Sequence, residues 1–172
     1  MGIDLTLKST AVTNREAVPR VLNNPGAGAA SMRRHVQGYF ASVTASLSAT
    51  SVIRMCEIDA HAIVTDLTFA SAAQTAGKFD IGVYRTNADG GAVVDQDFFA
   101  SDVDCASAVV LTDVLNESTT NTLLKQTQPL WLAAGMTADP GPGTMLDLCL
   151  TVHTTDITTG TGAVILKAGY VL

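Results

Sequence analysis

The feature that most constrains the fold is a succession of short apolar segments separated by turn-forming residues. Seven segments are rich in Val, Ile, Leu, Thr and aromatic residues and are bounded by Gly, Asn, Asp, Ser or Thr: VQGYFASV, TSVIRMCEI, AIVTDLTFA, FDIGVYR, VVLTDVL, MLDLCLTVHT and GAVILKAGYVL. This composition and spacing are typical of β-strands. We therefore predict an all-β chain, folded as an antiparallel sandwich or barrel.

Two of these segments show the alternation of a strand that has one dry face. In residues 146–152 every second residue is aliphatic (Leu146, Leu148, Leu150 and Val152). In residues 62–70, Ile63, Leu67 and Phe69 likewise share one parity, which is the period of two that a half-buried strand requires. Only two short segments favour a helix, Asp95–Ser101 and Pro129–Ala134, the second because Pro stands at a first helical position and Gly follows the last.

The first 35 residues differ in composition from the rest of the chain. They contain Pro19, the turn-forming run NNPG at 23–26 and the small-residue run AGAA at 27–30, which is too small to pack a core. We predict an extended N-terminal arm over residues 1–35 and a β-sandwich domain over residues 36–172. An arm that is ordered only against a partner and a plain flexible tail both fit this composition.

Charge is unevenly distributed between these two parts. Residues 1–40 carry five bases and two acids, a net charge of +3, whereas residues 41–172 carry five bases and fourteen acids, a net charge of −9. An acidic body disfavours nucleic acid as a partner, and a basic arm favours an acidic protein surface. No apolar stretch reaches the ~18 residues that a membrane span needs, so we expect neither nucleic acid nor membrane as a partner.

The cysteines indicate where the chain is made. Cys56, Cys105 and Cys149 are odd in number and far apart, with no CxxC pair. Buried, reduced thiols in a protein made in a reducing cytoplasm explain them best.

The loop Asn87-Ala88-Asp89-Gly90-Gly91 stands between two strand-like runs and poses the question of a ligand site. Asp-Gly between apolar runs is a strong hairpin signal, because Gly adopts positive φ at no cost. A phosphate site would need a glycine-rich loop that leads into a helix, and here a strand-like run follows. The loop is therefore predicted to be a turn.

Two regions of the sequence are candidates for a metal site: the acidic runs at 95–97 and 102–104, and the trio Glu57, Asp59 and His61. Counting a calcium loop from Asp95 places Ala100 and Ala106 where Gly and Glu are needed, so the clusters 95–97 and 102–104 are expected to be solvated acidic loops. Glu57, Asp59 and His61 share a parity at a strand end and could ligate a cation. A wet strand edge explains the same trio, and the sequence leaves the two readings open.

The sequence contains few features that favour catalysis or sugar binding. The chain has no GxSxG, no HExxH and no cysteine with a protease signature, and His35 and His153 have no spacing partner, so we expect no enzyme and no cofactor. A hydrolase whose catalytic residues lie far apart in the sequence is a further alternative. Phe98, Phe99 and Trp131 are expected to plug the ends of the sandwich, and aromatics make up only 5% of the chain, which weighs against a carbohydrate-binding sandwich.

One long stretch resembles a known family. It runs from SVIRMCEIDAHAIVTDLTFASAAQTAGKFDIGVYRTNADGGAVVDQDFFASDVDCASA to QPLWLAAGMTADPGPGTMLDLCLTVHTT. In the order of its apolar strands, its DGG hairpin block, the PLW motif and the Thr-rich end, it is similar to the small head decoration (cement) proteins of tailed bacteriophages. The resemblance covers about residues 50–171.

The resemblance implies a jelly-roll sandwich that forms a homotrimer on the outer capsid surface of a virion, after synthesis in the host cytoplasm. It implies a structural protein that stabilises the capsid by binding the major capsid protein, without catalysis. In this reading the arm bases Arg15, Arg20, Arg33 and Arg34 contact acidic capsid patches. The alternatives are a tail or neck component of the phage, present in few copies, and a carbohydrate-binding β-sandwich using Trp131 or Tyr39.

Overall fold

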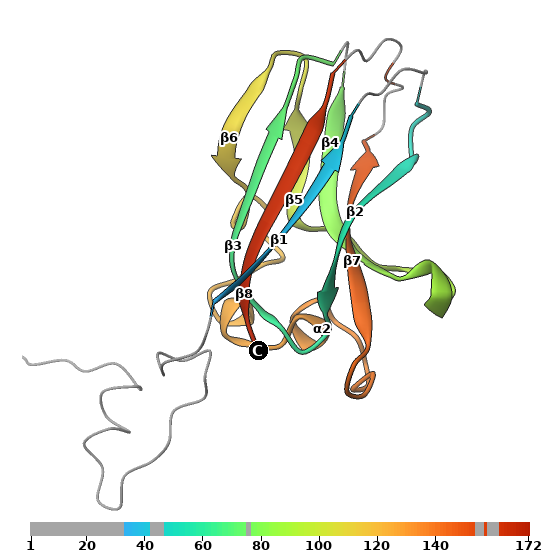
Figure 1. Cartoon of the computed structure of the whole chain (residues 1–172), viewed down its shortest axis with the longest axis vertical. Coiled ribbons are helices and arrows are strands. Elements are labelled where there is room, and N and C mark those ends of the chain that lie inside the picture. The colour runs from blue at the N-terminus through green and yellow to red at the C-terminus, as the bar shows by residue number, and fades with distance from the viewer. Residues whose placement is uncertain (1–32, 42–46, 75–76, 154–156, 158–161) are drawn as a thin grey trace, which may run out of the picture.

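The computed structural model contains two four-stranded antiparallel sheets that pack face to face (Figure 1). It describes residues 33–41, 47–74, 77–153, 157 and 162–172. The strands are β1 (Arg34–Phe40), β2 (Val52–Asp59), β3 (Ile63–Ser71), β4 (Lys78–Arg85), β5 (Val93–Asp104), β6 (Val109–Asp113), β7 (Met145–Val152) and β8 (Val164–Val171). The first sheet has the order β1-β8-β3-β6 and the second the order β2-β7-β4-β5, which confirms the predicted antiparallel sandwich.

The strand order is that of a jelly roll. The first strand pairs with the last, β2 pairs with β7, β3 with β6 and β4 with β5, all antiparallel. This is the pairing of one long hairpin whose two arms are wound together. Lateral pairs between β3 and β8 and between β4 and β7 join the pieces into two sheets, the double-sheet architecture of an eight-stranded jelly roll.

The core lies between the two inner faces and follows the alternation in the sequence. Leu146, Leu148 and Leu150 of β7 are fully buried, and so are Leu67 and Phe69 of β3. These inward side chains belong to one continuous hydrophobic cluster. The two predicted dry faces are thus confirmed.

The two central strands of the second sheet depart from this pattern, because β4 is buried on both faces from Phe79 to Tyr84 and β7 from Leu146 to Val152. The long strand β5 is irregular against β4, with three register shifts, and it passes over Gly82. A Cβ at Gly82 would lie 2.1 Å from the backbone oxygen of Gln96, so only glycine allows this approach. As a result, part of the outer face of the second sheet is covered by its own edge strand.

The two helical predictions have opposite outcomes. Residues Pro129–Ala134 contain the short helix α2 (Leu130–Ala133), with Pro129 directly before it and Gly135 at φ 89° after it. Residues Asp95–Ser101 are not helical but lie within β5, so that prediction was wrong. Phe98 and Phe99 are buried there, which shows that packing against the sandwich decided the conformation over a weak local preference.

The predicted arm lies almost wholly outside the described residues, which begin at Arg33. β1 starts at Arg34 and pairs through Arg34 and His35 with β8, so these two residues belong to the sandwich sheet. Within the part of the chain that the structure describes, no helix has the length and apolar character to cross a membrane.

Candidate functional site

The Asp-Gly-Gly loop is a turn, as predicted. Residues Asn87–Asp89 form one short 3-10 turn, and Gly90 and Gly91 follow at φ 83° and 67°. The amide of Arg85 then donates to the carbonyl of Ala92 at 2.8 Å, which closes the connection between β4 and β5. The glycines serve the backbone conformation, and the loop does not lead into a helix that could bind an anion.

Arg54 of β2 holds the base of this turn. Its guanidinium donates to the carbonyl of Arg85 at 2.7 Å and to that of Gly91 at 3.0 Å, and it forms an ion pair with Asp147 of β7. It also lies 5.9 Å from the ring centre of Tyr84. One side chain thus connects β2, β7 and both ends of the turn. This role could not be predicted, because the residues that Arg54 contacts lie far from it in the sequence.

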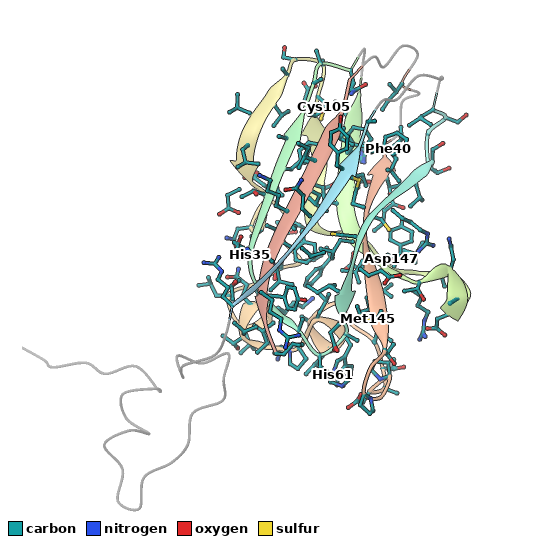
Figure 2. All side chains as sticks on the ribbon, viewed as in Figure 1. His35, Phe40, His61, Cys105, Met145 and Asp147 are labelled. Carbon is teal, nitrogen blue, oxygen red and sulfur yellow. The ribbon has the colours of Figure 1, made fainter. Side chains whose placement is uncertain are left out.

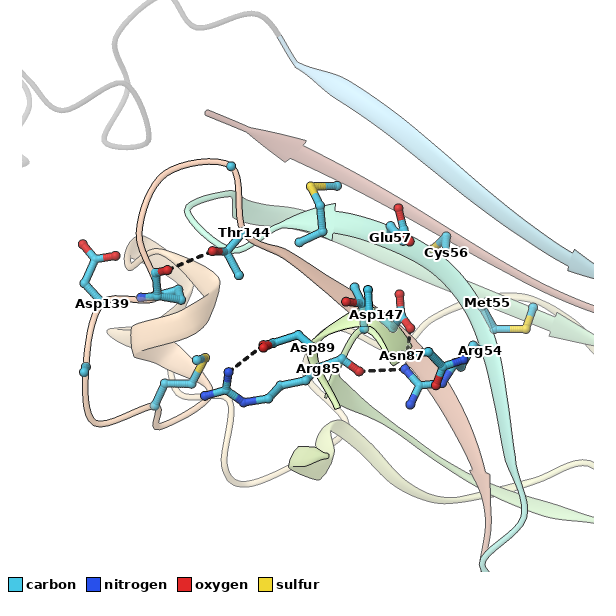
Figure 3. A pocket seen from close by; sticks show the side chains of 17 residues that line it. Arg54, Met55, Cys56, Glu57, Arg85, Asn87, Asp89, Asp139, Thr144 and Asp147 are labelled. Carbon is cyan, nitrogen blue, oxygen red and sulfur yellow. Dashed lines mark hydrogen bonds and ion pairs between the residues drawn. The ribbon is translucent and has the colours of Figure 1, made fainter. Parts of the chain in front are cut away.

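Arg54 also lies in the floor of an open groove of about 960 Å³. As Figure 3 shows, the groove runs between the β4–β5 turn and the loop that precedes β7. Its charged lining residues are two bases and four acids: Arg54, Arg85, Glu57, Asp89, Asp139 and Asp147. Its apolar lining includes Met55, Met136 and Met145, which are all the methionines that the structure describes.

The cysteine that lines the groove is not activated as a nucleophile. Burial, and then the charge of Asp147, raises the pKa of the Cys56 thiol to about 12. Such a thiol is protonated at neutral pH, whereas nucleophilic cysteines need a lowered pKa. Burial likewise raises the pKa of Cys105 to about 11 and that of Cys149 to about 12, and all three cysteines are unpaired.

The trio Glu57, Asp59 and His61 does not converge on a common point. His61 Nε2 lies 2.9 Å from Asp139 Oδ1, and its Nδ1 lies 3.5 Å from Asp59 Oδ1. Glu57 stands instead opposite Asp147 in the β2–β7 register. Among the described residues no group of three His, Cys, Asp or Glu side chains could hold a metal ion, so the fold does not bring Glu57, Asp59 and His61 together as one ligand set.

A buried carboxylate that the sequence did not single out organises the other end of the second sheet. The Asp80 side chain is 3% exposed and accepts hydrogen bonds from Gln96 Nε2 at 2.8 Å and the Asp102 amide at 2.9 Å. His153 Nδ1 lies 2.8 Å from its Oδ1. Burial acts to raise the pKa of Asp80, but the hydrogen bonds from His153, Asp102 and Gln96 together lower it below its ordinary value.

The acidic run of β5 contains a second perturbed carboxyl. Burial and the neighbouring Asp97 raise the pKa of Asp95 above its ordinary value. Asp102 forms an ion pair with Lys78 at 2.9 Å. Residues 95–97 and 102–104 both lie within β5, so the expectation that they form solvated loops was wrong: the pairing of β5 with β4 makes them part of a strand.

The outer face of the first sheet carries an apolar row across all four strands. Tyr39 stands opposite Ile165, which in turn stands opposite Ala70. A bulge in β6 then sets two residues, Val110 and Leu111, against the single residue Ala70. Tyr39 is 62% exposed, Val110 82% and Leu111 51%. We call these five residues the outer row.

The four arm residues predicted to contact a capsid have different positions. Arg15 and Arg20 lie outside the described residues. Arg33 forms an ion pair with Asp66 of β3, whose side chain reaches across β8 at Gly169. Arg34 is exposed at the start of β1 and directly precedes His35, which Figure 2 labels on that strand. Arg33 and Arg34 thus begin the sheet that carries the outer row.

The plug residues and the sugar-site candidates also have defined places. Phe98 and Phe99 are buried and pack edge to face at 4.7 Å, and Trp131 of α2 is half-buried against the core. Trp131 is thus not an exposed platform for a sugar ring.

Comparisons with known proteins add one distant likeness. No protein-family model matches the chain, and no curated protein matches it. Among solved structures, the chain is similar to a chain of "Cyanophage Pam1 capsid asymmetric unit", with 16% sequence identity and a TM-score of 0.48, over 91% of this chain and 96% of that chain. A likeness this distant does not assign a function.

Proposed function

We propose that this chain is a bacteriophage virion structural protein that decorates the head and stabilises it by binding the major capsid protein, without catalysis. The proposal follows the resemblance of residues 50–171 to head decoration proteins. The observation that carries it in the structure is the outer row. An exposed apolar row that crosses four strands is the kind of surface that marks a contact with another protein.

The two sheet faces differ in a way that favours this assignment. On the second sheet, β5 passes over Gly82, and the outward side chains Asp80, Asp147 and Thr151 are buried and hydrogen-bonded. On the first sheet, Tyr39 and Leu111 are exposed at opposite ends of the outer row. Contact through the first sheet would bury apolar surface and leave the polar network of the second sheet undisturbed.

The arm would add a second, electrostatic contact. In this proposal Arg15, Arg20, Arg33 and Arg34 meet acidic patches of the capsid protein, and many copies on one lattice add small contact energies together. Because Arg33 already pairs with Asp66, its replacement is expected to have the smallest effect of the four. Replacing all four by Ala should lower occupancy most at low salt, where charge contacts are strongest; unchanged occupancy at low salt would end the arm hypothesis.

The sheet-face contact is tested by co-sedimentation of variants with expanded, undecorated heads of the phage that encodes the chain. Tyr39→Asp and Leu111→Asp should each lower the affinity at least tenfold, because a buried charge without a partner is costly. Val52→Asp is the matched control, since Val52 is 41% exposed on β2 of the other sheet. Equal binding by all three folded variants would remove the outer row from the contact.

A further inference from the structure

The groove on the second sheet contains an acidic side chain, Glu57, that has no basic partner among the described residues. Glu57 stands directly opposite Asp147, and two like charges so placed repel each other. Arg54 pairs with Asp147, whereas Glu57 is exposed and has no ion-pair partner within the described chain. Arg85 is paired with Asp89 at 2.6 Å. None of the described residues thus supplies a cation to Glu57.

The apolar side of the same groove is formed by methionines. Met55 comes from β2, Met136 from the segment after α2 and Met145 from the start of β7. All three are half-buried, so each keeps part of its side chain exposed. Methionine is flexible and polarisable, which makes such surfaces able to adapt to aliphatic side chains of a bound segment. An occupant that combines aliphatic side chains with one base would satisfy both halves of the groove.

The segment Ile3-Asp4-Leu5-Thr6-Leu7-Lys8 of this chain has that combination. Its aliphatic residues Ile3, Leu5 and Leu7 alternate with polar residues, so in an extended conformation they share one face. Lys8 follows directly and can supply the missing cation. The aliphatic side chains of the segment would then lie against the apolar part of the groove, to which Met136 and Met145 contribute.

The length of the arm allows either its own groove or that of a second copy, and position favours the second copy. At ~3.3 Å per residue, the chain between Lys8 and Arg33 can span up to ~80 Å. Arg33 is held to Asp66 across the outer face of the first sheet, whereas the groove opens beside Arg54 and Asp147 of the second sheet. Within one copy the segment would have to pass around the sandwich, while a neighbouring copy can present its groove directly.

We propose that the groove lined by Met55, Met136 and Met145 binds residues 3–8 of a second copy of this chain, with Lys8 paired to Glu57. The inference does not depend on the proposed capsid role, because it concerns only contacts between copies. It predicts that the protein associates with itself in the absence of heads.

Photocrosslinking of the full chain tests the occupant. A benzophenone amino acid at position 145 is activated in an equal mixture of ¹⁵N-labelled and unlabelled protein, and the crosslinked peptides are identified by mass spectrometry. The expected result is a crosslink to residues 3–8 that joins a labelled copy to an unlabelled one. The same probe at Leu132, which is 43% exposed on α2 and outside the groove, should not capture this segment. Crosslinks within one copy, crosslinks to other segments, or none at position 145 would each overturn the proposal.

A charge exchange provides a test that does not rely on the crosslinker. Glu57→Lys and Lys8→Glu should each weaken self-association about fivefold in sedimentation equilibrium, and the double variant should restore it. Asp113→Lys on β6 of the first sheet is the control for a change of net charge. If the double variant associates no better than the single ones, Lys8 and Glu57 do not meet. Head binding is measured separately, so loss of self-association and loss of the capsid contact can be told apart.

Discussion

Removal of the buried carboxylate of Asp80 should destabilise the sandwich more than removal of any exposed acid. Its oxygens accept from Gln96 Nε2 at 2.8 Å, the Asp102 amide at 2.9 Å and Ser101 Oγ at 3.3 Å, and His153 Nδ1 lies 2.8 Å away. Asp80→Ala leaves these groups without their acceptor, at a cost of about 3 kcal/mol in the free energy of unfolding. Asp80→Asn keeps one acceptor oxygen, and we expect a loss of about 1 kcal/mol.

Urea unfolding followed by circular dichroism measures both losses. With a slope of about 2 kcal/mol per molar urea, Asp80→Ala should lower the midpoint by about 1.5 M. The matched control is Asp89→Ala, because Asp89 forms only an exposed ion pair with Arg85, and its loss should cost less than about 0.5 kcal/mol.

The contribution of Asp80 to stability should depend on pH. Because the pKa of Asp80 is lower in the folded protein than in the unfolded chain, its contribution to stability is complete above the unfolded pKa of about 3.9. It is lost as the pH falls through the folded pKa. The difference between wild type and Asp80→Asn should therefore be full at pH 7 and shrink below about pH 4. A midpoint of Asp80→Ala equal to that of Asp89→Ala, or a difference that persists unchanged in acid, would refute the role given to this network.

Three further perturbations test the backbone crossing, the turn and the thiols. Gly82→Ala should cost about 3 kcal/mol in unfolding free energy, because the new Cβ would lie 2.1 Å from a backbone oxygen. Gly135→Ala is the control: Gly135 has positive φ but open space around it, so its replacement should cost about 1 kcal/mol. Equal losses would contradict the crossing of β5 over β4. Arg54→Ala should lower the melting temperature by about 5 °C through loss of the contacts to Asp147 and the turn, with a thermal scan as the measurement. Cys105 and Cys149 should react with a disulfide reagent at pH 8 only upon unfolding, because both are buried and burial raises their pKa; rapid labelling of these two residues in the native protein would show that they are accessible.

The sequence predicted the parts of the fold that depend on local pattern. The alternation in 146–152 predicts the buried face of β7, and Asp89-Gly90-Gly91 predicts the turn between β4 and β5, because period and φ preference are properties of neighbouring residues. Residues 95–101 were misassigned as helix because burial of Phe98 and Phe99 depends on distant strands.

The sites could not be predicted in the same way. Arg54 and Asp147 are 93 positions apart in the chain, and they meet only because β2 pairs with β7. The outer row depends on the registers of three strand pairs and on a bulge opposite Ala70. Neither feature leaves a local signature in the sequence. The sequence also does not show whether Glu57, Asp59 and His61 point toward one another, which depends on the folded geometry.

The most direct test of the proposed function is a titration of expanded, undecorated heads with the purified wild-type protein, in which bound copies are counted against the major capsid protein after sedimentation. The account predicts saturable binding at a ratio near one copy per capsid subunit. A ratio of only a few copies per head would assign the protein to the neck or tail, and the absence of binding would contradict the capsid role altogether.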